Sequence, residues 1–426
     1  MNRKLSRSGK TGVSDKALHG RPFFMTLFLM GMLTVQLSAQ PYDLLIKGGH
    51  VIDPKNRINE PMDIAVNDGV VAKVSADIPA TDAAKVVDAT GHFVAPGFID
   101  MHAHVFFGST PRNFADGSYS VAPDNFSFRA GVTTVVDAGD SGWRNFPVFK
   151  EQVIDPSRTR VLVFLNIVGH GLRGDPYNNN FSDMDVEKTL SMIQQYPDII
   201  VGSRIGHIRQ NYWEPFEKAM EVAQLADMPM LLECNLPELE LEKTLASMRP
   251  GDIFAHAHQT GRRSLMDDQQ NRIYDFVNEA REKGIIFDVS HGGTSFRFSQ
   301  AIAAIEQGFY PDTFGTDLHF NSRNSGMKNM LNVMSKFLNM GMSLEDVILR
   351  ATWNAATALK REDLGHLSEG AVADIAVFKI NHGNFGFVDV RGYRMDGDRK
   401  LVAELTLREG RIVWDLNGLA APLWNE

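Results

Sequence analysis

Two histidines one residue apart, His102 and His104, stand at the end of a short apolar run from Gly97 to Val105. The run follows the turn signal Ala95-Pro96-Gly97 and is typical of a strand. Alternate side chains of a strand point the same way, so both imidazoles can face one metal ion. Two polar residues on the wet face of an edge strand are the alternative, but the apolar flanks favour a buried strand. The pair therefore predicts a metal site.

Further residues that can bind metal or carry protons stand where later strands are expected to end. They are His170, His207, Glu233, His256, His291 and Asp317, with additional histidines at His258 and His319. A single histidine at a strand end is commonly a hydrogen-bonded structural residue. A series of them at one end of one sheet indicates a catalytic metal centre, because the ligands of such centres come from several elements.

The middle of the chain alternates strand patterns with helix patterns, which predicts a (β/α)8 barrel of the TIM type. The expected strands are 97–105, 132–139, 160–168, 199–207, 229–234, 252–258, 285–291 and 313–319. The expected helices are 185–196, 214–226, 271–283, 299–307, 327–340 and 343–359. A doubly wound open sheet is the alternative, but no glycine-rich phosphate loop follows the first strand. In a barrel, chemistry gathers at the carboxyl ends of the strands, where the candidate ligands are found.

Short β-like segments, separated by Gly, Asn-Asp-Gly and Pro, fill the stretch before the barrel. Similar segments, 373–378 and 403–413, follow it. We therefore expect the two chain ends, 40–94 and 368–426, to share a small β-sandwich domain beside a barrel formed by 95–367.

The first 39 residues have the composition of a secretory signal peptide. Six basic residues and one acidic residue precede an apolar run from Phe23 to Leu37, and Leu37-Ser38-Ala39 is a plausible cleavage site. We expect cleavage near Gln40 and an exported protein, periplasmic or secreted, with no membrane insertion after cleavage. An uncleaved anchor is the alternative, although the apolar run is short for a membrane span.

Charge and cysteine content further restrict the classes of partner and fold that the sequence allows. The chain has a formal net charge of −9 and one cysteine. No basic run follows the leader, which argues against a nucleic-acid partner. One cysteine excludes an internal disulfide, so the fold depends on its core or on a metal. A small-molecule substrate is the expected partner, and apolar helices after the eighth strand would permit a homo-oligomer.

These motifs resemble those of the amidohydrolase superfamily, closest to its dihydroorotase-like deacetylase branch. The His102 and His104 pair resembles the family's first-strand signature, and Thr316-Asp317-Leu318-His319 resembles its eighth strand. Stretches 131–139, 164–167, 251–256 and 287–292 resemble its second, third, sixth and seventh strands. The resemblance implies a metal-dependent hydrolase with a composite sandwich domain. It also implies that His256 binds metal and that Asp317 is both a metal ligand and the catalytic acid/base.

Two positions depart from the family pattern. The family's fourth strand usually carries a lysine, in a context like Lys-x-Arg, that becomes carboxylated and bridges two metals. The corresponding stretch here, 202–209, has no lysine. His207 and Arg209 can be aligned with the lysine and arginine of that pattern. Arg204 is an alternative match for the arginine. In addition, the family's fifth-strand histidine is replaced by Glu233.

The two departures can compensate for each other. We hypothesise that Glu233 bridges two divalent ions, most naturally zinc, and that His207 joins His256 at the second ion. Such an exchange keeps the number of ligands and their charge. The alternative is one ion at His102, His104 and Asp317, with Glu233 acting from outside the ligand set.

The predicted activity is hydrolysis of an amide or ester bond in a small acylated molecule that carries a carboxylate. Metal-activated water would attack the carbonyl, with Asp317 as the proton carrier. His291 is predicted either to assist at the developing oxyanion or to be a structural turn residue. Ser295, Arg209 and His170 are candidate substrate contacts.

Two other functions stay open at this point. Ring opening of a cyclic amide, as in dihydroorotase, fits the family, but that reaction belongs to a cytosolic pathway and this chain is predicted to be exported. A non-catalytic metal- or ligand-binding protein would explain the changed ligands. Retention of Asp317 together with the histidine pair argues against it.

Overall fold

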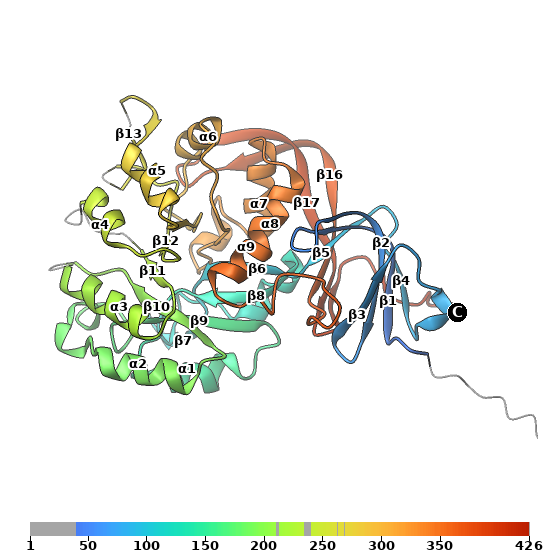
Figure 1. The fold of residues 1–426 in the computed structure, drawn as a ribbon, viewed down its shortest axis with the longest axis horizontal. Coiled ribbons are helices and arrows are strands. Elements are labelled where there is room, and N and C mark those ends of the chain that lie inside the picture. Colours follow the sequence, from blue (N-terminus) through green and yellow to red (C-terminus); the bar gives the residue numbers. More distant parts are fainter. Residues whose placement is uncertain (1–39, 210–212, 234–239, 262, 268, 426) are drawn as a thin grey trace, which may run out of the picture. The chain divides into compact units, whose positions relative to one another are not determined.

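The computed structural model describes residues 40–209, 213–233, 240–261, 263–267 and 269–425. The predicted signal peptide, 1–39, lies outside these residues. Among the helices that are described, none is both long and apolar enough to cross a bilayer. The fold has two large sheets, one from the ends of the chain and one from its middle (Figure 1).

The first large sheet joins the two ends of the described chain. Its strand order is β18-β17-β16-β5-β1-β2-β3, and β4 pairs with β1. The strands are β1 (Leu44–Asp53), β2 (Ile58–Asn67), β3 (Val70–Ser75), β4 (Val86–Asp88), β5 (Phe93–Pro96), β16 (Ile375–Val388), β17 (Arg394–Arg408) and β18 (Arg411–Asp415). β5 links the ends, because it pairs parallel with β1 and antiparallel with β16. Side chains of both ends, such as Ile46 and Leu405, share one buried cluster. The predicted composite β domain is confirmed.

The second large sheet is the wall of the barrel. Seven parallel strands follow in the order β15-β12-β11-β10-β9-β8-β6. They are β6 (Phe98–Ala103), β8 (Val132–Asp137), β9 (Arg160–Asn166), β10 (Ile200–Ile205), β11 (Met230–Leu232), β12 (Ile253–Phe254) and β15 (Ile286–Phe287). Each lies inside a predicted strand range. All their residues are buried except the half-buried Arg160 and Ile286, as expected of parallel strands covered on both faces.

An irregular segment takes the place of the predicted eighth strand, 313–319. It is held by two isolated bridges, Asp288 to Thr313 on one side and Ala103 to Leu318 on the other. The segment thus connects the β15 side to the β6 side and closes the barrel. Asp317 has a φ of 48°, outside the β region, which interrupts the ladder at the residue that carries the carboxylate. The predicted (β/α)8 barrel is confirmed, with the eighth strand replaced by this irregular segment.

Helices surround the barrel (Figure 1). They are α1 (Phe146–Phe149), α2 (Val186–Gln195), α3 (Trp213–Leu225), α4 (Leu241–Ser247), α5 (Asp275–Glu282), α6 (Phe298–Glu306), α7 (Met330–Asn339), α8 (Leu344–Ala351) and α9 (Trp353–Ala358). Asp185, Asn329 and Ser343 cap α2, α7 and α8 through side-chain oxygens, which satisfies an otherwise unpaired N–H.

Two helix predictions need correction, and two short helices were missed. The predicted helix 343–359 is divided at Thr352, whose φ and ψ are −131° and −92°. The predicted helix 271–283 begins only at Asp275, because the hairpin of β13 (Met266–Asp267) and β14 (Arg272–Ile273) precedes it. Helices α1 and α4 were not predicted. Their four and seven residues are too few to give a clear 3.6-residue period.

The hairpin of β16 and β17 extends from the first sheet to the barrel (Figure 1). β17 packs on α7, where the Leu401 N–H donates to Ser335 Oγ at 3.0 Å. At the turn, the Val390 N–H donates to the Phe296 carbonyl at 3.3 Å. The chain end therefore supports the barrel loop that carries Ser295.

Candidate active site

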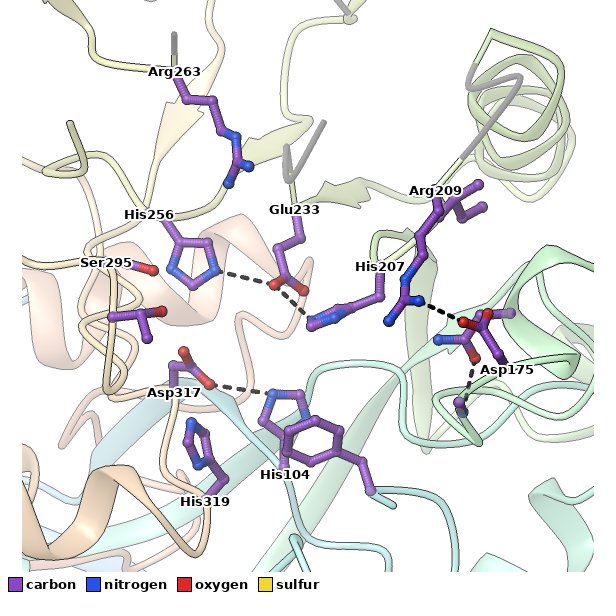
Figure 2. A pocket seen from close by; sticks show the side chains of 15 residues that line it. His104, Asp175, His207, Arg209, Glu233, His256, Arg263, Ser295, Asp317 and His319 are labelled. Atoms are coloured by element: carbon purple, nitrogen blue, oxygen red, sulfur yellow. Dashed lines mark hydrogen bonds and ion pairs between the residues drawn. The ribbon is translucent and has the colours of Figure 1, made fainter. Parts of the chain in front are cut away.

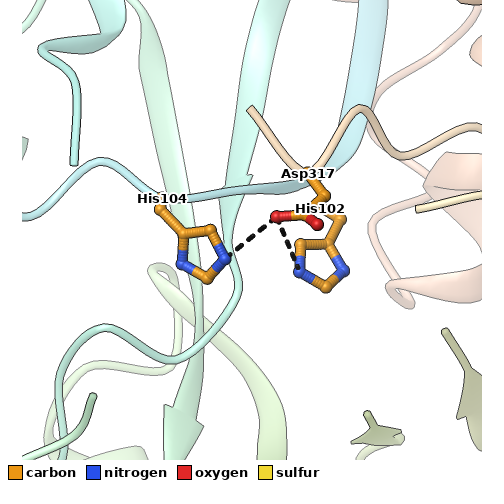
Figure 3. A group of neighbouring side chains, drawn as sticks. All are labelled: His102, His104 and Asp317. Carbon is orange, nitrogen blue, oxygen red and sulfur yellow. Dashed lines mark ion pairs between the residues drawn. The ribbon is translucent and has the colours of Figure 1, made fainter. Parts of the chain in front are cut away.

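His102, His104 and Asp317 bring three donor atoms together at the carboxyl end of the barrel strands (Figure 3). Asp317 Oδ1 lies 3.2 Å from His104 Nε2 and 4.0 Å from His102 Nε2. All three donor atoms lie within 4.8 Å of one another. Ligands about 2.0–2.1 Å from a tetrahedral zinc ion lie about 3.3 Å apart. The spacing and the N, N, O chemistry fit a divalent ion.

We call His102, His104 and Asp317 the first set. Each of its two imidazoles is held by a contact at Nδ1, the ring nitrogen that faces away from Asp317. His104 Nδ1 lies 2.6 Å from Asp140 Oδ1, and His102 Nδ1 lies 2.9 Å from Ser290 Oγ. The Ser290 hydroxyl in turn donates to Asp288. A carboxylate can only accept, so Nδ1 of His104 carries the proton when the ring is neutral and Nε2 is left to bind metal. His102 Nε2 is buried and has no hydrogen-bond partner in the described part of the chain.

The pKa values of the first set also suit a cation. Burial lowers the pKa of His102 to about 3, which keeps that ring neutral. Burial alone would lower the pKa of His104, but the Asp140 and Asp317 carboxylates raise it to about 10. Burial would raise the pKa of Asp317, but the surrounding histidines hold it below its usual value. Two carboxylates therefore favour positive charge at His104, which a metal ion at Nε2 would supply in place of a proton.

A second set of side chains lies beside the first (Figure 2). The rings of His102 and His256 are 5.5 Å apart. Glu233 Oε1 lies 2.9 Å from His207 Nε2 and 3.3 Å from His256 Nε2. These three residues directly follow the neighbouring strands β10, β11 and β12. The structure thus brings together Glu233, His207 and His256, the three residues that the sequence assigned to the second ion.

The other oxygen of Glu233 contacts Arg204, which lies within β10. Arg204 Nη2 donates to Glu233 Oε2, and the arginine side chain is 0% exposed. Burial would raise the pKa of Glu233, but the charges of His207 and Arg204 hold it well below its usual value. A bridging carboxylate offers one oxygen to each ion. Because Oε2 faces Arg204, the geometry does not support the predicted bridging role of Glu233.

Except for His102, the residues of both sets line one pocket of about 350 Å³. The predicted substrate contacts Ser295 and Arg209 also line it. Arg209 is at the rim, since its side chain is 78% exposed and forms an ion pair with Asp175 at 2.7 Å. Phe114 and Arg263 also line the pocket, and the sequence did not single them out within the loops 106–124 and 258–270. Both residues belong to strand-to-helix loops, and this position in the barrel was the only sequence signal that they would face the pocket.

Two predicted site residues lie elsewhere. His291 is fully buried and does not line the pocket. Its Nδ1 lies 2.9 Å from the Gly292 carbonyl and its Nε2 lies 2.6 Å from Lys336 Nζ, so both ring nitrogens are occupied and the structural role is favoured over the catalytic one. His170 also lies outside the pocket lining, with its ring 4.8 Å from that of Tyr177. Its predicted substrate contact is not supported, because its loop turns the ring toward its own residues.

Several site residues have left-handed backbone. The φ values of His207, His256 and Asp317 are 57°, 64° and 48°. Such conformations cost about 1 kcal/mol or more for residues with a Cβ, and they persist where surrounding structure imposes them. Their concentration around one pocket is consistent with side chains held for a function.

A parallel barrel with histidines and an aspartate gathered at the carboxyl ends of its strands is the arrangement of a barrel hydrolase with a possible metal site. Comparison with known proteins gives the family. The amidohydrolase family model matches residues 295–394. A deacetylase from Agrobacterium fabrum is 31% identical over 333 residues, which cover 76% of this chain and 80% of the relative.

Solved structures agree with this assignment. An adenine deaminase is 27% identical with a TM-score of 0.81, covering 88% of this chain and 100% of that protein. A dihydroorotase is 27% identical with a TM-score of 0.74, covering 87% and 99%. The chain therefore belongs to the amidohydrolase superfamily, as the motifs indicated. It is a hydrolase that acts on carbon–nitrogen bonds other than peptide bonds.

Proposed function

We propose that the protein removes an acyl group from a nitrogen atom of a small carboxylate-bearing molecule, with the help of a divalent ion such as zinc. The observation that carries this proposal is the compact donor set of His102, His104 and Asp317 beside a pocket that also presents two arginines. The deacetylase activity of the Agrobacterium fabrum relative supports acyl removal.

The chain's own groups account for binding and proton transfer. A divalent ion held by the first set would provide a nucleophilic water at neutral pH and polarise the acyl carbonyl. Asp317 is ionised and lines the pocket, so it can accept a proton from the attacking water and deliver it to the leaving nitrogen. Asp140 and Ser290 keep both histidine rings oriented during these steps.

The pocket wall suits an anionic substrate. Arg263 and Arg209 contribute the cationic side chains of the lining, on opposite sides of Glu233 in Figure 2. Ser295 adds a hydroxyl to the same lining. A carboxylate at the rim would gain from the arginines, while the acyl group would reach the first set.

The test is hydrolysis by the zinc-loaded protein of N-acetylated amino acids, a cyclic amide and adenine. We expect acetate release from an N-acetylated carboxylate. Turnover of the cyclic amide alone would favour ring opening, and turnover of adenine alone would favour deamination. No turnover of any of the three with zinc bound would favour a binding protein.

A matched pair of variants tests the assigned acid/base. Asp317→Asn should lower kcat/KM by about 10²–10⁴-fold, the usual contribution of general acid–base catalysis. His170→Ala, which lies outside the pocket, should change it by less than about threefold. Metal content is measured in both, because Asp317 is also a ligand. Equal activity of Asp317→Asn and wild type would refute the assignment.

A further inference from the structure

Arg204 places a fixed positive charge inside the barrel, next to the second set of donors. The side chain is fully buried, Nη2 donates to Glu233 Oε2, and Nε and Nη1 find no hydrogen-bond partner among the residues that the structure describes. Arginine keeps its proton in proteins. Glu233 is therefore neutralised by a side chain of the protein itself.

The barrel is shaped to accommodate this side chain. A Cβ on Gly139, just after β8, would lie 2.5 Å from Arg204 Cδ, and Gly139 has a φ of +81°. A Cβ on Gly206, just after β10, would lie 3.0 Å from Arg204 Nη2. Both positions thus leave room that only glycine gives. The arginine is part of the packing between the strand ends, so it is not a surface side chain that could swing away.

A divalent ion at the second set would lie close to this guanidinium. Its only carboxylate in that set would be Glu233, whose Oε2 is already engaged by Arg204. Positive charges this close repel strongly in a buried site, where water screens them poorly. One carboxylate cannot balance both a guanidinium and a divalent ion.

We propose that Arg204 takes the place of a second metal ion. The chain binds one divalent ion, at His102, His104 and Asp317, and the Arg204–Glu233 pair fixes His207 and His256 in the pocket wall. Arg204 and Glu233 are then positioning residues. This inference rests on the proposed function only in treating the first set as the metal site.

The experiment counts metal on the protein and does not depend on turnover. Purified protein is freed of metal with a chelator, equilibrated with zinc by dialysis, and analysed for zinc per chain. We expect about one zinc in wild type and in Arg204→Lys, which keeps a positive charge. We expect about two in Arg204→Met, because removal of the charge frees Glu233. The double variant Arg204→Met with Glu233→Gln should return to about one.

Each outcome decides the proposal. Two zinc ions in wild type would overturn it, as would one zinc in an Arg204→Met protein that folds normally by circular dichroism. If Arg204→Met does not fold, the cobalt-substituted wild type decides. Electron paramagnetic resonance of an isolated Co²⁺ ion supports the proposal, and a spin-coupled pair refutes it. If the wild-type protein binds one zinc ion but hydrolyses none of the test compounds, the proposed function is contradicted and this inference still stands.

Discussion

Asp140→Asn should weaken metal binding although Asp140 touches no metal. Asp140 Oδ1 holds His104 Nδ1 at 2.6 Å, while Oδ2 accepts from the Phe106 N–H at 3.1 Å and from Ser120 Oγ at 2.7 Å. An asparagine that keeps its oxygen toward Phe106 turns its NH2 toward His104. The ring must then accept at Nδ1 and carry its proton on Nε2, the atom that has to bind metal.

The opposite orientation of the asparagine is also unfavourable. Its oxygen would accept from His104, but its NH2 would face the buried N–H of Phe106. A buried donor left without an acceptor costs about 1–3 kcal/mol. Loss of a carboxylate behind a metal-binding histidine typically weakens affinity about 10–100-fold, or about 1.4–2.7 kcal/mol. Zinc binding requires this second orientation, because only then is His104 Nε2 free, so the cost of the unpaired N–H falls on the zinc-bound form. The two estimates of the loss in zinc affinity then agree.

The assay is competition for zinc between metal-free protein and a chelator of known affinity. Asp252→Asn is the control, because Asp252 is equally buried but accepts from the Met230 and Arg249 N–H groups at the start of β11 and β12, away from the ligands. The control should lose stability and keep its zinc affinity. Zinc affinity of Asp140→Asn within about twofold of wild type, or an equal loss in Asp252→Asn, would refute the reasoning.

Two further predictions concern Gly292 and Lys336. Gly292→Ala should impair both stability and zinc affinity, because φ is +57° and the new Cβ would lie 2.1 Å from Asp317 Oδ2. Gly308→Ala is the control, because its φ is +77° and its Cβ would meet open space. In denaturation experiments the control should lose only about 1–2 kcal/mol of stability, and it should keep its zinc affinity. Burial lowers the pKa of Lys336 to about 7, against about 10.4 in the unfolded chain. Between pH 7 and 10 the unfolded chain holds this proton more tightly, so wild-type stability should rise relative to Lys336→Met across that window. A stability difference between the two that is constant with pH, in urea unfolding, would contradict this.

The sequence predicted most of the barrel because its strands are apolar runs bounded by turn residues. Seven strands lie within the predicted ranges. The eighth differs because Asp317 adopts a positive φ, which a residue pattern does not encode. The split of helix 343–359 at Thr352 is similar, since apolar periodicity continues across a break in backbone direction.

The site was predictable in part for the same reason. Alternation along a strand was enough to place His102 beside His104, and strand ends were enough to place Asp317 near them. Strand order does not say which atoms face each other across the barrel. The roles expected of His291 and His170 depended on that, and the structure turns both rings away from the pocket.

Sequence alone determined the repeating order of strands and helices, the composite β domain and the family. It also determined the first set, His102, His104 and Asp317. These follow from local periodicity and from motifs within a few residues of each other. Tertiary structure decided that Glu233 faces Arg204, 29 residues away, and that His291 faces Lys336, 45 residues away. Such pairs are set by packing between elements distant in the chain, where the direction of a side chain depends on the volume and charge of its neighbours.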